Sequence, residues 1–379
     1  MSTYPTYKLG EIIDKVSIEF KVKQKEYLPK GKFPVVDQGQ DLIGGFVDDE
    51  SLLVKTELPV IVFGDHTKAK KFIDFPFVAG ADGTKIIKPK KEFFIEPKLF
   101  YWFLHCVKFP DKGYARHFQY LLKSDIAIPP LATQHAIVTR IETLFAELDK
   151  AVQHLRTAQQ QLKTYRQAVL NHWLNNEDGK WETVKLGEVA DAIDPEPSHR
   201  TPKIQKDGIP FVSIKDCDYI TNTINLKTAR LVSKDILTEH KERYSIKEGD
   251  FIIGKIGTIG NPVNVILPQE YALSANVVLI QPTDKINANF LYNAFRSNIV
   301  EKQLFDGKKA TTQAAFGIKK VRLIEIPLPP LAEQQRIVNE IESRLSQATA
   351  SETYIENAQQ QAEALRQSIL KKAFSGELV

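Results

Sequence analysis

The stretch PPLATQHAIVTRIE begins at Pro129, and a closely similar stretch, PPLAEQQRIVNEIE, begins at Pro329. The two copies lie 200 positions apart (329 − 129), and matching residues continue at the same offset as far as Leu170 and Leu370. No insertion interrupts the repeat. An internal repeat of this length has to be interpreted before any fold is assigned.

Both copies predict long helices. Each follows a pair of prolines, which a helix start tolerates, and no further Pro or Gly occurs before Gly179 and Gly376. Apolar residues recur every seven positions, which predicts a coiled-coil seam, and the Ala positions of the second copy would face the Leu positions of the first. The predicted rows are Ile141, Leu148, Leu155, Leu162, Val169 and Leu144, Ala151, Ala158, Tyr165 in the first copy, and Ile341, Ala348, Ile355, Ala362, Ile369 with Ala358 and Leu365 in the second.

A second and weaker repeat precedes the first. YKLGEI at residues 7–12 is similar to VKLGEV at residues 184–189, so the whole chain has the order A–B–A′–B′. We predict a first domain at 1–127, a first long helix at 128–175, a second domain at 176–326 and a second long helix at 327–379. Because only a short polar link joins the first helix to the second domain, a second helix packed on the first has to run antiparallel to it. The plan predicts pseudo-twofold symmetry.

The two domain segments show short β-rich runs that alternate with turn signals. Each also contains one helix-like stretch, at 98–107 and at 287–300. The predicted fold class is therefore α+β, with two globular mixed α/β domains separated by two long, antiparallel, coiled-coil-like helices. Beyond their opening motif, the two domains differ greatly in sequence.

Composition narrows the function without deciding it. The formal charge is +4, from 51 basic and 47 acidic residues, and several lysines are clustered, as in KAKK at 68–71 and KPKK at 88–91. Such clusters attract phosphates, although an ordinary solvated surface explains each of them equally well. No apolar run approaches the roughly 20 residues of a membrane helix, and no signal peptide or disulfide pattern is present. We expect a cytoplasmic protein without membrane contact.

Enzyme motifs are missing from the sequence. There is no P-loop, no dinucleotide fingerprint, no HExxH or paired CxxC, and no Asn/Asp-Pro-Pro-aromatic tetrad typical of amino-methyltransferases. Asp65 and His66 adjoin but have no nucleophile, and His105 and Cys106 are expected to be packed core residues. The sequence predicts a chain with no catalytic residue, no metal and no cofactor of its own.

The duplicated helices resemble one family closely. IPLPPLAEQQRIV at 326–338, the ending ILKKAFSGELV at 369–379, the two KLGE openings and GDFIIGKIGTIGN at 249–261 are together similar to the specificity (S) subunit of type I restriction–modification enzymes. The resemblance covers the whole chain. The first helix start departs from the pattern, since it lacks one Leu-Pro and has Thr-Gln-His at 133–135 where the second copy has Glu-Gln-Gln.

This resemblance implies a function. The two domains would be target-recognition domains, each reading one half of a bipartite, asymmetric site in double-stranded DNA. The helices would set the spacing and dock two methyltransferase (modification) subunits, and a restriction (translocase and nuclease) subunit would complete the complex. S-adenosylmethionine, ATP and Mg would belong to those partners. A pseudo-twofold protein suits duplex DNA because the duplex has a local twofold axis of its own.

Candidate DNA-binding residues are the polar and basic side chains in loops that interrupt the β-rich runs. Arg and Lys bind phosphates or guanine edges, and Gln pairs with adenine, while a solvated surface residue remains the alternative for each position taken alone. The candidates in the first domain are His66, Thr67, Lys68, Lys70, Lys71, Arg116 and His117. Those in the second domain are Ser213, Lys215, Lys255, Thr258, Lys308, Lys309, Thr311, Thr312 and Gln313.

The sequence leaves two alternative functions open. A coiled-coil structural adaptor without DNA recognition would explain the heptads but not two large, unlike domains. A remnant of a fused restriction–methylation enzyme would need cofactor and nuclease motifs, which the sequence lacks. A salt-dependent gel shift distinguishes a DNA-recognition protein from the adaptor. Incubation with S-adenosylmethionine and DNA distinguishes it from the enzyme remnant, which would methylate the DNA by itself.

Overall fold

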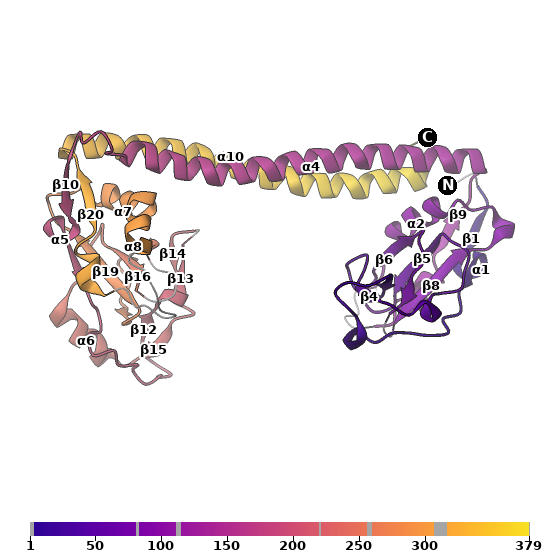
Figure 1. Cartoon of the computed structure of the whole chain (residues 1–379), viewed down its shortest axis with the longest axis horizontal. Helices are drawn as coiled ribbons and strands as arrows, with labels where there is room; N and C mark the ends of the chain where they lie inside the picture. The colour runs from indigo at the N-terminus through magenta and orange to yellow at the C-terminus, as the bar shows by residue number, and fades with distance from the viewer. Residues whose placement is uncertain are drawn as a thin grey trace. The chain divides into compact units, whose positions relative to one another are not determined.

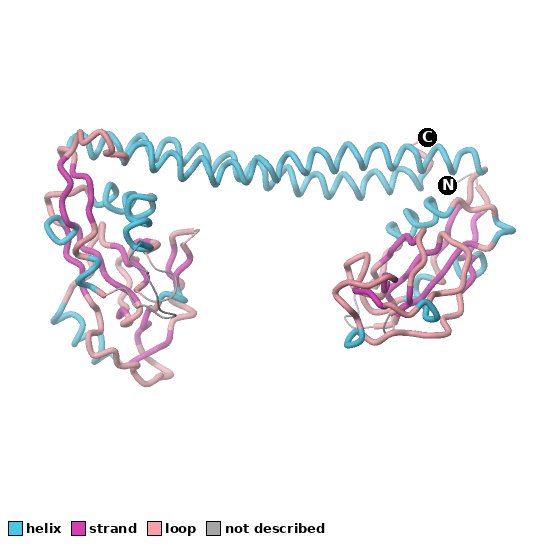
Figure 2. Tube along the Cα trace, in the orientation of Figure 1, coloured by secondary structure: helices cyan, strands magenta, loops and turns pink. Residues whose placement is uncertain are grey.

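The computed structural model describes residues 4–80, 83–110, 115–219, 221–255, 260–306 and 317–378 of the chain. Its contacts divide the chain into two compact units. Unit 1 is Met1–Arg156 with Glu356–Val379, and unit 2 is Thr157–Ile355. Each unit contains one globular domain, part of the first long helix and part of the second (Figures 1 and 2).

Domain 1, the globular part of unit 1, is a mixed α/β structure. Its strands are β1 (Thr6–Lys8), β2 (Ile13–Lys15), β3 (Phe33–Val36), β4 (Gly45–Val47), β5 (Val60–Gly64), β6 (Lys70–Ile73), β7 (Val78–Ala79), β8 (Thr84–Pro89) and β9 (Asp125–Ala127). Its helices are α1 (Leu9–Ile12), α2 (Pro97–Cys106) and α3 (Phe118–Leu121), with 3-10 turns η1 (Gln24–Glu26), η2 (Glu50–Leu52) and η3 (Lys91–Phe93).

The strands of domain 1 form two main sheets. The larger has the order β2-β8-β5-β6 and is antiparallel, and the smaller has the order β4-β3-β7, with β3 and β7 parallel. The central strand β5 is buried along its whole length, as its sequence VIVFG predicts for an interior strand. Helix α2 begins at Pro97 with the Glu96 side chain as its N-cap, and buries Phe100 and Leu104 in the core.

Domain 2, the globular part of unit 2, contains more elements. Its strands are β10 (Glu182–Lys185), β11 (Ala190–Ile193), β12 (Ile209–Val212), β13 (Cys217–Asp218), β14 (Thr223–Ile224), β15 (Arg230–Val232), β16 (Phe251–Gly254), β17 (Pro262–Asn264), β18 (Ala272–Leu273), β19 (Val277–Pro282) and β20 (Glu325–Leu328). Its helices are α5 (Leu186–Val189), α6 (Lys234–Arg243), α7 (Ala288–Arg296), α8 (Asn298–Asp306) and α9 (Ile318–Val321), with one 3-10 turn η4 (Ile214–Asp216).

The sheets of domain 2 repeat those of domain 1. The order β11-β19-β16-β17 matches β2-β8-β5-β6, and β15-β12-β18 matches β4-β3-β7, including the single parallel pairing. The registers also agree: Pro34 pairs with Phe46 as Pro210 pairs with Leu231. The KLGE motifs form α1 and α5, whose Gly10 and Gly187 donate to the carbonyls of Leu122 and Arg322. The two domains therefore share one framework, although their sequences diverged.

The repeated stretches form α4 (Leu131–Leu174) and α10 (Leu331–Ser375). In each unit the start of one helix packs on the end of the other, so the pair is antiparallel. Unit 1 joins Ile137, Val138, Ile141 and Phe145 of α4 to Ile369, Leu370 and Ala373 of α10. Unit 2 joins Val169, Leu170 and Leu174 of α4 to Ile337, Val338 and Ile341 of α10. The predicted fold class, including the coiled-coil-like pair, is confirmed.

The second predicted row is only partly buried: Leu144, Ala158 and Ala358 are half-buried. The row that begins at Ile141 and Ile341 is buried or half-buried, but Ala151 is exposed and the side chains of Tyr165 and Leu365 are 39% and 51% exposed. The second row contains instead Phe145 and Val152, together with their counterparts in α10. In a heptad the second row of the seam can follow the first by three or by four residues. The row that follows by four contains the polar residues Gln159 and Arg166, so it does not stand out as an apolar row in the sequence.

No helix in the described part of the chain is long and apolar enough to cross a membrane.

Candidate nucleic-acid interface

We call three loops of each domain the front loops, although in domain 1 the candidates Lys70 and Lys71 belong to strand β6 and the loop after β3 carries no candidate. In domain 1 they follow β3 (37–44), follow β5 (65–69) and precede α3 (107–117). The corresponding chain segments of domain 2 follow β12 (213–222), follow β16 (255–261) and precede α9 (307–317), and their residues 220, 256–259 and 307–316 lie outside the described residues. Among the described residues, the candidates Ser213, Lys215 and Lys255 of domain 2 lie in two of these segments.

Hydrogen bonds join the front loops of domain 1 to one another. The side-chain Oε1 of Gln38 accepts a hydrogen bond from the backbone N–H of His66 at 3.3 Å. The backbone carbonyl of Gln38 accepts one from the Thr67 hydroxyl at 2.5 Å. The N–H of His117 donates to the carbonyl of Asp65 at 2.7 Å, and the Asp65 carboxylate accepts from Phe118 N–H at 2.9 Å. The candidates His66, Thr67, Arg116 and His117 thus share one hydrogen-bonded region.

Two half-buried candidates of domain 1, Lys68 and Lys70, lie beside Phe109. Thr67 and Arg116 are exposed, and Lys68 adopts a left-handed backbone conformation (φ 61°). The ammonium groups of Lys68 and Lys70 lie 6.0 Å and 5.4 Å from the centre of the Phe109 ring. Burial lowers the pKa of Lys70. These lysines concentrate positive charge next to the His66–Thr67 loop.

Two candidates of domain 1 lie inside the domain, although the sequence placed them in surface loops. Lys71 is 4% exposed, and its ammonium lies 3.6 Å from the Asp37 carboxylate. His117 is fully buried, and neither of its ring nitrogens has a hydrogen-bond partner. Lys71 belongs to β6, where alternate residues point into the core, and the backbone of His117 is held against Asp65.

The described candidates of domain 2 are also partly buried. Ser213 is 9% exposed and donates to Asp216 at 2.9 Å, whereas Lys215 is exposed. Lys255 is 5% exposed and its ammonium lies 2.6 Å from the Asp194 carboxylate. The candidates Thr258, Lys308, Lys309, Thr311, Thr312 and Gln313 lie outside the described residues.

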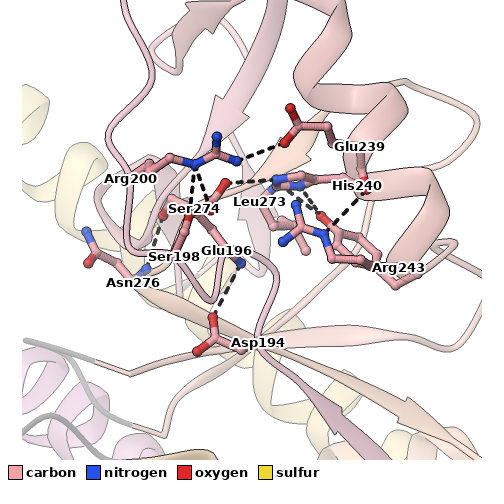
Figure 3. Close-up of polar contacts among 11 residues, drawn as sticks. Asp194, Glu196, Ser198, Arg200, Glu239, His240, Arg243, Leu273, Ser274 and Asn276 are labelled. Atoms are coloured by element: carbon pink, nitrogen blue, oxygen red, sulfur yellow. Dashed lines mark hydrogen bonds and ion pairs between the residues drawn. The ribbon is translucent and has the colours of Figure 1, made fainter.

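A buried polar chain that the sequence did not suggest supports the region beside β12 (Figure 3). His240 Nε2 lies 3.3 Å from Glu196 Oε2, and His240 Nδ1 lies 2.8 Å from the Tyr244 hydroxyl. The ionised Glu196 carboxylate can only accept, so the His240 proton is on Nε2. Nδ1 then accepts from the Tyr244 hydroxyl, whose oxygen also accepts from Leu273 N–H at 3.3 Å. A neutral His240 thus donates to an ionised Glu196.

The pKa shifts agree with these protonation states. Burial lowers the pKa of His240, and the hydrogen bond to Glu196 offsets this only in part. Burial alone would raise the pKa of Glu196, but hydrogen bonds from Ser198 and His240, together with the charge of Arg200, outweigh it and lower that pKa. The carboxylate of Glu196 therefore anchors the segment that follows β11 to helix α6.

A cavity of about 340 Å³ opens next to this anchor. It lies between β12, the start of β15, the segment after β11 and the segment after β18. It is lined by His199, Arg200, Thr201, Phe211, Ser213, Ile214, Lys215, Arg230, Ser274, Ala275 and Asn276. Two sequence candidates, Ser213 and Lys215, line it, and sequence reasoning missed Arg200, Arg230 and Asn276. The shared x-Pro-x-Val of Phe33–Val36 and Ile209–Val212 could have aligned the domains and drawn attention to this place.

On helix α2, His105 and Cys106 are half-buried, as expected for packed residues. The His105 ring contacts Tyr101 and Trp102, and its Nε2 is buried without a hydrogen bond. Burial and then the charge of Lys70 lower the pKa of His105 to about 4, and burial raises that of Cys106 to about 11. Within the described residues, no group of three or more His, Cys, Asp or Glu side chains is placed to hold a metal.

A family model matches the chain in two segments. Residues 1–155 and 178–363 match the family model described as "Type I restriction modification DNA specificity domain". The EcoBI specificity subunit of Escherichia coli is 28% identical over 284 residues, which cover 67% of this chain and 58% of that protein. The EcoR124I/EcoR124II specificity subunit of the same species is 26% identical over 351 residues, covering 87% and 84%.

Solved structures share the fold. A chain from a structure titled as the basis of complex assembly and conformational transition of the type I R-M system has a TM-score of 0.70, with 20% identity, over 99% of this chain and 98% of its own length. The HsdS subunit from Thermoanaerobacter tengcongensis has a TM-score of 0.57, with 21% identity, over 99% and 97%. Since the family model matches both domains and most of both long helices, the chain belongs to the type I restriction–modification DNA specificity family.

Proposed function

We propose that this chain is the non-catalytic DNA sequence-specificity subunit of a type I restriction–modification complex. Each domain reads one half of a bipartite, asymmetric site in double-stranded DNA. The observation that carries this proposal comes from comparing the two domains. Both domains have the same strand order and register, but their front loops present different side chains. Loops on a rigid scaffold are where binding residues concentrate.

The long helices support the second half of the proposal. Residues of α4 that pack in one unit correspond to residues of α10, 200 positions later, that pack in the other unit. Each unit therefore offers an equivalent helical surface. Two equivalent surfaces suit two copies of one partner, and we assign them to two methyltransferase subunits. Catalysis, and the binding of S-adenosylmethionine, ATP and Mg²⁺, belong in this proposal to the methyltransferase and restriction subunits. The helices set the spacing between the two half-sites.

Methylome sequencing of a host with and without the gene tests this function directly. We expect one bipartite motif to lose methylation when the gene is deleted, and a gene that encodes Arg116→Ala to restore the motif with an altered or weakened half. Arg116 is exposed on a front loop of domain 1, and one good arginine contact to a base contributes about 1–3 kcal/mol of discrimination.

The control is Lys163→Ala, an exposed residue of α4 that should leave both half-sites unchanged. If deletion changes no motif, and the complex of the chain with its methyltransferase subunits shows no salt-dependent duplex binding, the protein is an adaptor and the proposal fails.

A further inference from the structure

The 340 Å³ cavity of domain 2 has a one-sided charge. Arg200, Lys215 and Arg230 line it, and none of its lining residues is Asp or Glu. Two of these cations differ in how far they are already neutralised. The Arg200 guanidinium donates to Glu239 at 2.8 Å and lies 3.6 Å from Glu196. Arg200 is therefore compensated by carboxylates outside the cavity.

Arg230 is not compensated in this way. It begins strand β15, its side chain is half-buried, and its Nη1 donates to the carbonyl of Pro202 at 3.3 Å. In the described part of the chain no carboxylate lies within 4.0 Å of its guanidinium. A guanidinium has five N–H donors, so most of those of Arg230 remain available to a ligand. A half-buried cation of this kind favours an anion with several acceptor oxygens.

The other cavity walls suit the same ligand. Lys215 lies on the turn η4, which directly follows β12, and brings an exposed ammonium to the same cavity, because β12 ends beside the start of β15. Ser213 is held by Asp216, and the backbone of Asn276 is held by the Ser274 hydroxyl at 3.3 Å, so the polar walls are fixed before a ligand binds. Their supports include the buried Glu196–His240 pair, which fixes the segment carrying Arg200. Fixed donors lose little entropy on binding.

Geometry selects which part of DNA would enter. Base edges lie within grooves and have to be read by side chains that project outward, whereas phosphates stand on the outside of the duplex. A concave site on the protein surface therefore accepts a backbone phosphate. We infer that Arg230 and Lys215 bind one DNA backbone phosphate in this cavity and so fix the position of domain 2 on its half-site. This inference rests on the proposed function.

Domain 1 has a different chemistry at the same framework position. The register places Gly45 where domain 2 has Arg230, since Val35 pairs with Gly45 as Phe211 pairs with Arg230. A Cβ at Gly45 would lie 2.6 Å from Cβ of Tyr27, so no larger side chain fits there. The position of Ser213 is taken by Asp37, which accepts from the Tyr27 hydroxyl at 3.1 Å. Domain 1 therefore has neither the arginine nor the serine of this cavity at the equivalent positions.

The test uses the full chain in complex with its methyltransferase subunits. The probe is a fluorescent pool of random duplexes of about 40 base pairs, measured between about 50 and 200 mM salt. Arg230→Gln should weaken binding about tenfold and lower the slope of log K against log salt by about 0.9, the value for one phosphate. Arg230→Lys should keep the slope and lose only part of the affinity, because it keeps the charge without the planar fork.

Two comparisons separate this inference from other outcomes. Arg243→Gln removes the same charge from α6 outside the cavity lining, and should change the slope little. The methylated motif of a host carrying Arg230→Gln should stay unchanged, because a phosphate contact positions the protein without reading sequence.

An unchanged slope for Arg230→Gln, or an equal loss for Arg243→Gln, overturns the phosphate site while the proposed function stands. An altered motif assigns Arg230 to a base and also overturns it. If the wild-type complex neither binds duplex nor methylates a motif, the proposed function and this inference fail together.

Discussion

The two domains keep one framework and differ in what they hold at its front. Phe33–Val36 (β3) and Ile209–Val212 (β12) are the central strands of equivalent sheets, and their neighbouring strands correspond on both sides. At the end of that strand domain 1 has Asp37 paired with Lys71, and domain 2 has Ser213 beside a cationic cavity. Strand pairing therefore tolerates a change of front-loop chemistry, because the sheet is stabilised by its core and by its backbone hydrogen bonds.

The numbering shows where the domains diverged in length. Pro34 corresponds to Pro210, an offset of 176 (210 − 34), and Gly64 corresponds to Gly254, an offset of 190 (254 − 64). Domain 2 thus gains 14 residues (190 − 176) between these strands, where β13, β14 and α6 lie. The offset reaches 200 at Gln134 and Gln334. Added chain lies between framework strands and leaves their pairing intact.

The largest expected effect tests whether the helix starts are equivalent. Gln134 is buried, its Nε2 donates to the carbonyls of Pro129 and Phe94, and its Oε1 accepts from Glu96 N–H, the N-cap of α2. Gln334 likewise donates to Pro329 and accepts from Asn287 N–H, the N-cap of α7. Replacing either glutamine by alanine should cost about 3 kcal/mol, because buried backbone groups lose their partners.

Hydrogen exchange measures this cost unit by unit, in the first turns of α2 and α7. Gln160→Ala, at an exposed position of α4, is the matched control and should change protection by less than about 0.5 kcal/mol. A large loss for one glutamine with no loss for the other would show that the helix starts are not equivalent.

The second effect sharpens the comparison through pH. His105 on α2 has the framework position of Arg296 on α7, since the N-caps Glu96 and Asn287 differ by 191 (287 − 96; 105 + 191 = 296). The folded pKa of His105 is about 4, below its ordinary 6.5. The unfolded chain therefore binds the extra proton first as pH falls. Unit 1 should lose about 2–3 kcal/mol of unfolding free energy between pH 6.5 and 4 through this group.

Trp102, whose ring lies 5.8 Å from that of His105, reports on this loss. With Trp173 and Trp181 replaced by Phe, it is the remaining tryptophan of the three. Denaturant unfolding followed by its fluorescence should show a weaker pH dependence for His105→Phe than for the parent. Equal pH dependence in the two proteins would assign the acid sensitivity of unit 1 to other groups.

The smallest effect compares the two ends of the helix pair. Arg166 pairs with Glu352 at 2.6 Å in unit 2, and the equivalent Arg366 pairs with Asp149 in unit 1. Arg366 also lies 4.6 Å from the centre of the Phe145 ring, where unit 2 has Leu345. Each Arg→Ala variant should cost about 0.5–1 kcal/mol. Thermal melts at about 0.1 and 1 M salt measure the stability loss of each variant. The higher salt should abolish most of the loss caused by Arg166→Ala but only part of the loss caused by Arg366→Ala, because stacking on an aromatic ring is less screened. An identical salt response of the two variants would show that the contact with the Phe145 ring does not contribute to the effect of Arg366.

Much of the fold follows from local pattern. The proline pairs, the absence of Pro and Gly over the repeats, and the heptad at Ile141 and Ile341 predict the helices, because helix periodicity is a short-range property. The second seam row could not be predicted, because the choice between Leu144 and Phe145 depends on the neighbouring helix. Lys71 and Lys255 likewise read as surface lysines, since their carboxylate partners Asp37 and Asp194 are distant in sequence.

The amino-acid sequence by itself determined the duplicated plan, the two long helices and the family, because repeats, helix periodicity and motifs are all written along the chain. The tertiary structure alone decided that two divergent domains share one sheet order. It also decided that Glu196 and His240 meet as a buried pair, and that Arg230 faces a cavity without an acidic residue. These are contacts between segments tens of residues apart, and burial and charge compensation arise only once the chain is packed.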